Sequence, residues 1–316
     1  MRSIAITRSG VLVTGSSGFI GQHLCGELQR RQGGAPLRAV SVDIADRAAL
    51  DALASRTGTA AVIHLAAYGR VVAPTSVCAE MFATSVHGTL NVLRSLQPRV
   101  IVFASSCAVY GETPSTGVRP EFAPPSPVGL YGLAKHAAEM LIAQWAAETT
   151  NSGVVLRIGN VIGAGCGGLI PYLVRHAIAH PDGNVPAQLR GGGCVVRDYV
   201  PVAHAVRIMA AAAEREWLRG EFRTFNVSTG RGTANRRVAE IVGGLMAAHG
   251  YRLRVEYSDS TARGEAWQAI LDPRSTTDEF GIEAPDADCV LDAIETAAMT
   301  QLRALAPAGS PAEQSK

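Results

Sequence analysis

The chain has 316 residues, enough for one large α/β domain that carries a smaller lobe. Hydrophobic residues make up 47% of it and charged residues 18%, which suits a globular core and argues against intrinsic disorder. A formal net charge of +2 gives no bias toward nucleic acid or an anionic membrane, and no apolar run reaches the roughly 18 residues of a spanning helix.

The six cysteines are scattered, with no CxxC pair and no histidine at metal-ligand spacing. We therefore expect neither a metal site nor a disulfide framework. The first residues, MRSIAITRSG, lack the apolar stretch of a secretory signal. Together these features predict a cytoplasmic protein.

Strands and helices alternate along the first half of the chain. Apolar, β-branched runs predict buried strands at 11–15, 60–67, 99–106 and 153–160. Apolar side chains at helical spacing predict helices from Ile20 to about Arg31, over Phe82–Leu93 and over Ala138–Trp145. Residues 37–50 predict one short strand and one helix. This alternation implies a doubly wound parallel sheet with helices on both faces.

Past residue 163 the alternation loosens, and glycine-rich stretches at 163–168 and 191–193 mark loops. Residues 205–216 and 234–248 are predicted to be helical. We expect a large domain over 1–165, with later segments near 200–230 packed on it, and a smaller α/β lobe over 166–306. The tail, 307–316, is predicted to be disordered.

Segment TGSSGFIG places Gly15, Gly18 and Gly21 as GxxGxxG between a strand and a helix. The glycines permit a tight turn and close backbone approach, so a pyrophosphate can contact the unpaired N–H groups that begin the helix. The context predicts a dinucleotide site, and the alternative is a glycine-rich turn without a ligand.

Tyr131 and Lys135, in YGLAK, share one face of a helix. The preceding strand ends in SSCAVYG, and open α/β sheets bind ligands at the carboxyl ends of their strands. A lysine ammonium beside the phenol is expected to lower the tyrosine pKa, and Ser106 can hydrogen-bond the same substrate oxygen. The alternative is a surface tyrosine and lysine without a catalytic role.

With these motifs in this order, residues 11–285 resemble the extended short-chain dehydrogenase/reductase family, in its NAD-dependent nucleotide-sugar epimerase/dehydratase branch. The matching segments are TGSSGFIG, HLAA (64–67), SSCAVYG (105–111), YGLAKHAAE (131–139), RIGNVIGAG (157–165) and VRDYVPV (196–202). The resemblance implies a Rossmann-type dinucleotide-binding domain over 1–165 and a nucleotide-sugar-binding lobe over 166–306.

Family roles carry over to the matching positions. Ser106, Tyr131 and Lys135 form the implied catalytic trio. The implied cofactor contacts are Gly15, Gly18, Phe19, Ile20, Gly21, Asp43, Ile44, Leu65, Ala66, Ala67, Tyr131 and Lys135. The implied substrate contacts are Ser106, Cys107, Asn160, Leu169, Ile170, Arg197 and Arg263, with the two arginines on the diphosphate.

The region 32–46 is shorter than the resemblance implies. Family members have two strands here: the first ends in an acidic residue on the adenosine ribose, and the second in a DxxD whose first aspartate meets adenine. Only one strand fits, so Asp43 is predicted to contact the cofactor in one of these two roles. On the ribose it would repel a 2′-phosphate, which favours NAD and leaves NADP open. Asp46 is interpreted as a helix N-cap.

Two departures bear on the reaction. Sugar dehydratases and decarboxylases that resemble the family keep carboxylates where this chain has Cys107 and Ala108. Water elimination needs an acid and a base besides the tyrosine, so those reactions lose support. Cys107 itself is interpreted as a buried small residue, with a weak acid or a lining of the sugar pocket as alternatives.

The leading prediction is an NAD-dependent nucleotide-sugar 4-epimerase. Tyr131 would take the proton of the 4-hydroxyl while the cofactor accepts the hydride and returns it through a transient 4-keto sugar. The alternatives are an NAD(P)H-dependent 4-ketoreductase of a nucleotide 4-keto-6-deoxy sugar and a non-catalytic dinucleotide-binding module. The expected partner is a nucleotide-diphosphate sugar, and the resemblance implies a homodimer. Sugar and base are left open.

Overall fold

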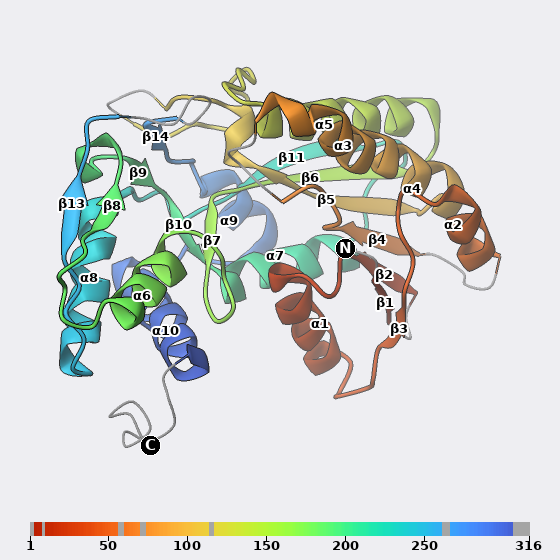
Figure 1. Ribbon diagram of the computed structural model, residues 1–316. Helices are drawn as coiled ribbons and strands as arrows, with labels where there is room; N and C mark the ends of the chain where they lie inside the picture. The colour runs from red at the N-terminus through yellow and green to blue at the C-terminus, as the bar shows by residue number, and fades with distance from the viewer. Residues whose placement is uncertain are drawn as a thin grey trace.

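A computed structural model describes residues 3–7, 10–55, 60–69, 74–113, 117–260 and 266–305. These residues contain a seven-stranded sheet in the order β11-β6-β5-β4-β2-β1-β3 (Figure 1). Its strands are β1 (Ile4–Ile6), β2 (Val11–Thr14), β3 (Arg38–Val40), β4 (Ala61–His64), β5 (Val100–Ser106), β6 (Ser152–Ile158) and β11 (Phe222–Val227).

The strands predicted from apolar runs are all present. They form β2, β4, β5 and β6, and each pairs in parallel with its neighbour in the sheet. Helices cover both faces of this sheet, so its central strands are apolar on both faces rather than alternating, and polar residues stand only at their carboxyl ends. Val62, Ile63 and Val102 are accordingly 0% exposed.

The N-terminal strand β1 was missed by the sequence analysis. It lies between β2 and β3 and is antiparallel to both, with Ile4 opposite Thr14 and Val40. The single strand predicted within 37–50 is β3. The place beside β2 is therefore filled from the start of the chain, and the predicted doubly wound parallel sheet carries one antiparallel strand near its edge. Three residues are too short to show a strand period.

Two layers of helices enclose the sheet (Figure 1). On one face, α1 (Phe19–Arg31) and α7 (Val202–Glu214) pack through Leu24, Leu28 and Met209. The other face carries α2 (Arg47–Ala54), α4 (Gly88–Leu96) and α5 (Leu130–Glu148). Val92 and Ile142 lie in the core beneath this second layer.

The helix predicted over Phe82–Leu93 has a π-helical turn in it. α3 (Cys78–Phe82) leads through this turn, η2 (Ala83–His87), into α4. Around this turn the buried side chains are Met81, Ser85 and Thr89, whereas Phe82, Val86 and Leu90 of the predicted stripe are only half-buried. Its last member, Leu93, is buried. The predicted apolar stripe is thus turned partly away from the core, because a π turn adds a residue to the helical period.

The C-terminal lobe has its own hydrophobic core. Leu173, Val242 and Ile294 belong to this core, one from each of three packed helices. The helices are α6 (Leu169–Ala179), α8 (Asn235–Ala248) and α10 (Ala287–Leu305). Its short strands are β7 (Asn160–Ile162), β8 (Ala187–Leu189), β9 (Val196–Arg197), β10 (Tyr199–Pro201), β12 (Thr233–Ala234), β13 (Val255–Tyr257) and β14 (Gln268–Ala269).

Three short 3₁₀ turns and one further helix complete the described elements. They are η1 (Thr75–Val77), η3 (Cys107–Val109), η4 (Gly191–Gly193) and α9 (Arg274–Phe280). The predicted division at residue 165 stays a prediction, and the tail 307–316 lies outside the described residues. No described helix combines the length and the apolar character needed to cross a membrane.

Candidate active site

The glycine turn joins β2 to α1. Gly15 has a φ of +72°, and a Cβ atom there would lie 2.9 Å from the backbone nitrogen of Ala66. A Cβ on Gly21 would lie 2.2 Å from the carbonyl oxygen of Gly15. Gly18 precedes α1 without a side-chain cap, and the first turn of α1 has no acidic residue. The turn therefore leaves backbone N–H groups for an anion, as a dinucleotide pyrophosphate requires.

A groove of about 550 Å³ runs from this turn to α5. Most predicted cofactor residues line it, namely Gly15, Gly18, Phe19, Ile20, Gly21, Leu65, Ala67, Tyr131 and Lys135. Tyr68 and Gly69, which the sequence analysis did not select, line it too. The backbone N–H of Tyr68 donates to Ser85 Oγ at 3.2 Å. The residues present thus fit a dinucleotide.

Three predicted cofactor residues do not line this groove. Ala66 is 2% exposed, and its N–H donates to Thr14 Oγ1. Ile44 is 1% exposed and packs against Gly88. Asp43 follows β3, one strand farther from the glycine turn than β1, and its carboxylate accepts from the Ala45 N–H at 3.0 Å. A cofactor contact of these residues stays a prediction, and the strand order favours the adenine role for Asp43 over the ribose role.

Asp46 caps α2, as predicted. Its carboxylate accepts a hydrogen bond from the Ala49 N–H at 3.0 Å. This bond satisfies one of the donors that begin a helix.

A buried hydrogen-bond chain passes through His64, behind the groove. Its Nδ1 lies 2.7 Å from Thr14 Oγ1, and its Nε2 lies 3.0 Å from Thr89 Oγ1. Thr89 donates its hydroxyl to the Ser85 carbonyl, so Nε2 carries the ring proton and Nδ1 accepts from Thr14. Burial, with Lys135 nearby, lowers the pKa of His64 to about 3. The imidazole is therefore neutral and ties β2 to β4 and α4.

The predicted catalytic trio is brought together at the carboxyl end of β5. Ser106 ends this strand, and Tyr131 and Lys135 come from the first two turns of α5. The Lys135 ammonium donates to the Ala104 carbonyl at 2.6 Å and lies 5.9 Å from the centre of the Tyr131 ring. Helical spacing places both side chains on one side of α5, facing the strand end.

The pKa of Tyr131 differs from the sequence-based expectation. Burial raises it to about 12, although a hydrogen bond from Ser106 opposes the rise. Burial also lowers the pKa of Lys135 to about 8, against the attraction of Glu139. The Lys135 ammonium is directed to a carbonyl and gives the phenol little help in losing its proton. The protein alone therefore keeps Tyr131 protonated at neutral pH.

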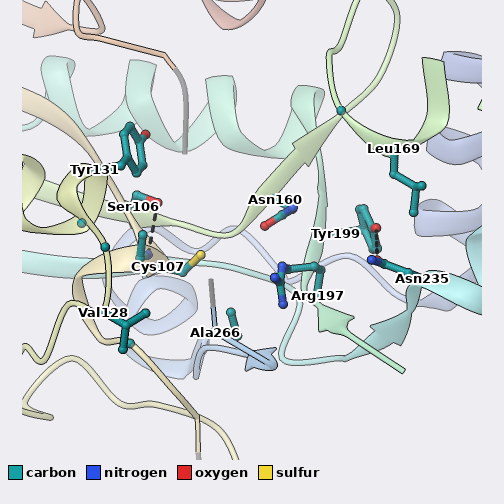
Figure 2. A pocket seen from close by; sticks show the side chains of 16 residues that line it. Ser106, Cys107, Val128, Tyr131, Asn160, Leu169, Arg197, Tyr199, Asn235 and Ala266 are labelled. Carbon is teal, nitrogen blue, oxygen red and sulfur yellow. Dashed lines mark hydrogen bonds between the residues drawn. The ribbon is translucent and has the colours of Figure 1, made fainter. Parts of the chain in front are cut away.

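A second cavity, of about 290 Å³, opens beside the groove. Ser106, Tyr131, Asn160 and Gly168 line both spaces. Figure 2 shows Cys107, Asn160 and Arg197 around the cavity, contributed by η3, β7 and β9. The hydroxyls of the predicted trio thus lie where a dinucleotide and a second ligand would meet.

Arg197 is the one charged side chain among the described residues that line this cavity. It is 8% exposed, and its Nη1 donates to the carbonyls of Val196 at 2.9 Å and Trp267 at 3.3 Å. The next residue, Asp198, is 0% exposed and accepts from the N–H groups of Thr229 and Gly230. Asp198 therefore fixes the strand that carries Arg197. A guanidinium held in this way suits a phosphate group.

Cys107 is a buried small residue, as interpreted from the sequence, and it also lines the cavity, which was one of the alternatives. It is 8% exposed, and burial raises the pKa of its thiol, although Arg197 opposes this. The thiol is therefore neutral. The backbone N–H of Ala108, next along the chain, donates to Ser106 Oγ at 3.2 Å and so orients the serine hydroxyl.

The remaining predicted substrate residues separate into three cases. Asn160 and Leu169 line the cavity. Ile170 does not: it is 1% exposed and lies in the core of the lobe, because it faces inward from the first turn of α6. Arg263 lies outside the described residues. Within them, no group of three histidine, cysteine or acidic side chains is arranged to hold a metal ion.

The sequence analysis missed Tyr199 and Asn235. Both line the cavity, and the Tyr199 hydroxyl donates to Asn235 Oδ1 at 3.1 Å. Tyr199 lies within VRDYVPV, so the motif contained a signal for it. Asn235 begins α8 and follows no motif, so only the fold brings it to the site.

Sequence profiles of known families give an independent result. The profile of the NAD dependent epimerase/dehydratase family matches residues 11–228. The chain belongs to this family. The match spans the glycine turn, the trio at β5 and α5, and Arg197, so the motifs used above fall within it.

Individual members of the family are also similar to this chain. It is 28% identical to "Putative UDP-arabinose 4-epimerase 2" of Arabidopsis thaliana, over 85% of this chain and 74% of that protein. It is 29% identical to "UDP-glucose 4-epimerase" of Rhizobium leguminosarum bv. trifolii, over 78% and 84%. The structure "MoeE5 in complex with UDP-glucuronic acid and NAD" superposes with a TM-score of 0.82 at 27% identity, covering 93% of this chain and 99% of that one. The Rossmann-type fold is confirmed.

Proposed function

We propose that this protein is an NAD-dependent nucleotide-sugar 4-epimerase. The observation that carries the proposal is the shared lining of the two cavities: Ser106 and Tyr131 lie where the groove that begins at the glycine turn meets the cavity that holds Arg197. A hydroxyl placed there can reach both a cofactor and a sugar. Similar proteins bear the names of UDP-arabinose and UDP-glucose 4-epimerases, which supports the same reaction.

Each member of the trio has a task in this proposal. Tyr131 takes the proton from the 4-hydroxyl of the sugar and later returns it. Ser106 hydrogen-bonds the same oxygen, with its own hydroxyl oriented by the Ala108 N–H. Bound NAD supplies the hydride acceptor and the positive charge of its nicotinamide ring. Because burial raises the pKa of Tyr131 to about 12, the phenol needs a neighbouring positive charge before it can serve as a base.

The lining favours epimerisation over loss of water. No described residue of the sugar cavity is an aspartate or a glutamate. Cys107, which lines it, is held neutral by burial. Elimination of water needs an acid and a base beyond the tyrosine, and the described lining supplies neither.

The substrate proposed for the cavity is a nucleotide-diphosphate sugar. Arg197 would bind the diphosphate through charge-assisted hydrogen bonds. Asn160 and Leu169, which line the cavity, are proposed to contact the nucleotide of this substrate. Arg263 is proposed to join Arg197 on the diphosphate, as the family motif implies.

Two further proposals concern the state of the protein. We propose a homodimer built through α3, α4 and α5, because Leu133 is 46% exposed and Met140 58% exposed on α5 beside half-buried Phe82, Val86 and Leu90. Sedimentation of the purified protein tests this.

We also propose a cytoplasmic location, since all six cysteines are unpaired, as suits a reducing compartment.

The function is tested by incubating the protein with UDP-glucose, UDP-galactose, UDP-xylose and UDP-arabinose in D₂O. We expect one pair to interconvert with the hydrogen at C4 retained, because an internal hydride return exchanges nothing with solvent. Loss of that hydrogen to deuterium would contradict hydride return. If instead no pair interconverts and NADPH is consumed with a nucleotide 4-keto-6-deoxy sugar, the protein is the ketoreductase.

A further inference from the structure

The strand beside the glycine strand is unusual in this protein. β1 follows β2 in the order of the sheet (Figure 1). It runs antiparallel to β2, with Ile4 opposite Thr14. This register puts Ser3 next to Gly15. The carbonyl of Ser3 accepts from the N–H groups of Gly15 at 2.9 Å and Ser16 at 3.3 Å.

The side chain of Ser3 is paired as well. Its hydroxyl donates to Ser17 Oγ at 2.7 Å and accepts from the Ser17 N–H at 2.8 Å. Ser17 is exposed and Ser3 is half-buried. Two hydroxyls therefore form an accessible pair at the glycine turn, and the described residues place no carboxylate in contact with them.

The Ser3–Ser17 pair lies on the side of β2 where a dinucleotide would place its adenosine half. The catalytic trio lies on the β4–β5 side of β2, so the nicotinamide half of a dinucleotide belongs there and the adenosine half lies on the β1 side. In such folds the second strand runs parallel to the glycine strand and ends in an acidic residue, which holds the ribose 2′-hydroxyl and repels a 2′-phosphate. Here an antiparallel strand occupies that place and presents Ser3.

We propose that the Ser3–Ser17 hydroxyl pair forms the ribose edge of the cofactor site, so that this protein separates NAD from NADP only weakly. The inference rests on the dinucleotide binding proposed above. A hydroxyl pair can hydrogen-bond a ribose hydroxyl or a phosphate oxygen and repels neither. Asp43, which the sequence analysis considered for the ribose, is one strand farther out, about 5 Å across the sheet.

The test measures dissociation constants of NADH and NADPH by fluorescence, in wild type, Ser3→Asp, Ser17→Asp and Asp43→Asn. We expect wild-type constants within about tenfold of each other. Either new carboxylate should raise the ratio of the NADPH to the NADH constant at least about tenfold, since like charges are brought together. Asp43→Asn should leave the ratio unchanged. Ser17→Asp alters an exposed side chain, so it keeps the test valid if Ser3→Asp unfolds the protein.

The outcomes separate this inference from the proposed function. If wild type binds both cofactors or NADH alone, and neither carboxylate variant changes the ratio, the ribose edge lies elsewhere and the proposed function still stands. A ratio that changes only in Asp43→Asn would return the ribose to Asp43. If wild type binds neither dinucleotide, both proposals fail.

Discussion

The sheet differs on the two sides of β2 in the direction of its strands, and therefore in which residues lie at the edge where the two cavities open. On the β4, β5 and β6 side every strand is parallel, so the strand ends meet at one edge and carry Ser106 there, with Tyr131 and Lys135 on the helix that follows. On the other side β1 and β3 make an antiparallel pair with each other, and the chain enters β1 at the same edge of the sheet. The residue at that edge is Ser3 rather than an acidic strand end.

The difference shows which parts of a dinucleotide fold can vary. The catalytic side depends on a shared edge, because a proton, a sugar oxygen and the cofactor must meet within hydrogen-bond distance. The adenosine side only has to hold a ribose and a base far from the reaction. An antiparallel strand can therefore replace the usual parallel strand on this side without moving Ser106, Tyr131 and Lys135.

Tyr131→Phe should have the largest effect and acts on the catalytic side alone. It removes the oxygen that moves the proton, so kcat should fall at least about 100-fold while the affinity for NADH is unchanged. Tyr172→Phe, on α6, is the matched control, and it should keep normal activity. A near-normal kcat in Tyr131→Phe would remove this residue from the proposed reaction.

The buried histidine gives a pH-dependent prediction. The native pKa of His64 is about 3, below the 6.5 of the unfolded chain. Between these values the unfolded chain binds a proton that the native protein lacks, so the free energy of unfolding falls as the pH is lowered from 6.5 toward 3. In His64→Gln, the loss of stability between about pH 7.5 and 4.5 should be about 2–3 kcal/mol smaller than in wild type.

Urea unfolding at the two pH values measures this difference. His249→Gln, at the end of α8, serves as the control for the removal of one histidine. An equal pH dependence in wild type and His64→Gln would mean that His64 is not held neutral.

Arg197→Ala tests whether the cavity beside the groove binds the diphosphate of the substrate. Loss of a charge-assisted donor should weaken the binding of UDP about tenfold or more in calorimetric titrations. Arg237→Ala removes a guanidinium from the surface of α8, where it pairs with Glu240, and should leave the affinity unchanged. Arg263→Ala in the same assay tests the role implied by the family motif. Unchanged UDP affinity in both Arg197→Ala and Arg263→Ala would exclude the proposed diphosphate site.

Gly26→Ala should have the smallest effect, and it separates the glycine of α1 that the turn requires, Gly21, from one that it does not, Gly26. A Cβ on Gly26 meets nothing within 4 Å, whereas one on Gly21 would lie 2.2 Å from the Gly15 carbonyl oxygen. Alanine at position 26 should therefore stabilise the protein by about 0.5–1 kcal/mol, because it favours the helix and fits without strain. Weaker NADH binding or a lower unfolding midpoint in Gly26→Ala would show that Gly26 also serves the turn.

The sequence predicted that Ser106, Tyr131 and Lys135 come together, because Ser106 ends a long buried strand and the other two lie on the next long helix. The run at 99–106 fixes β5, and the position of Ser106 follows from it. β1 could not be predicted in the same way, since its three residues pair with strands on either side only after the chain has folded. The prediction of a lowered pKa for Tyr131 was wrong. The spacing shows that Lys135 is near the tyrosine, but it does not show that the ammonium donates its hydrogen bond to the Ala104 carbonyl.

The β1–β2 pair also bears on the order of folding. Parallel strands meet only after a long crossover has closed, whereas β1 and β2 are close together in the chain and pair locally as antiparallel strands. Local contacts form with a smaller loss of chain entropy, so we expect this pair to be structured early and to give the parallel strands an edge on which to assemble. Ile4→Val should then slow folding, while Ile294→Val, in the core of the lobe, should mainly speed unfolding. The reverse pattern would place the start of folding in the C-terminal lobe.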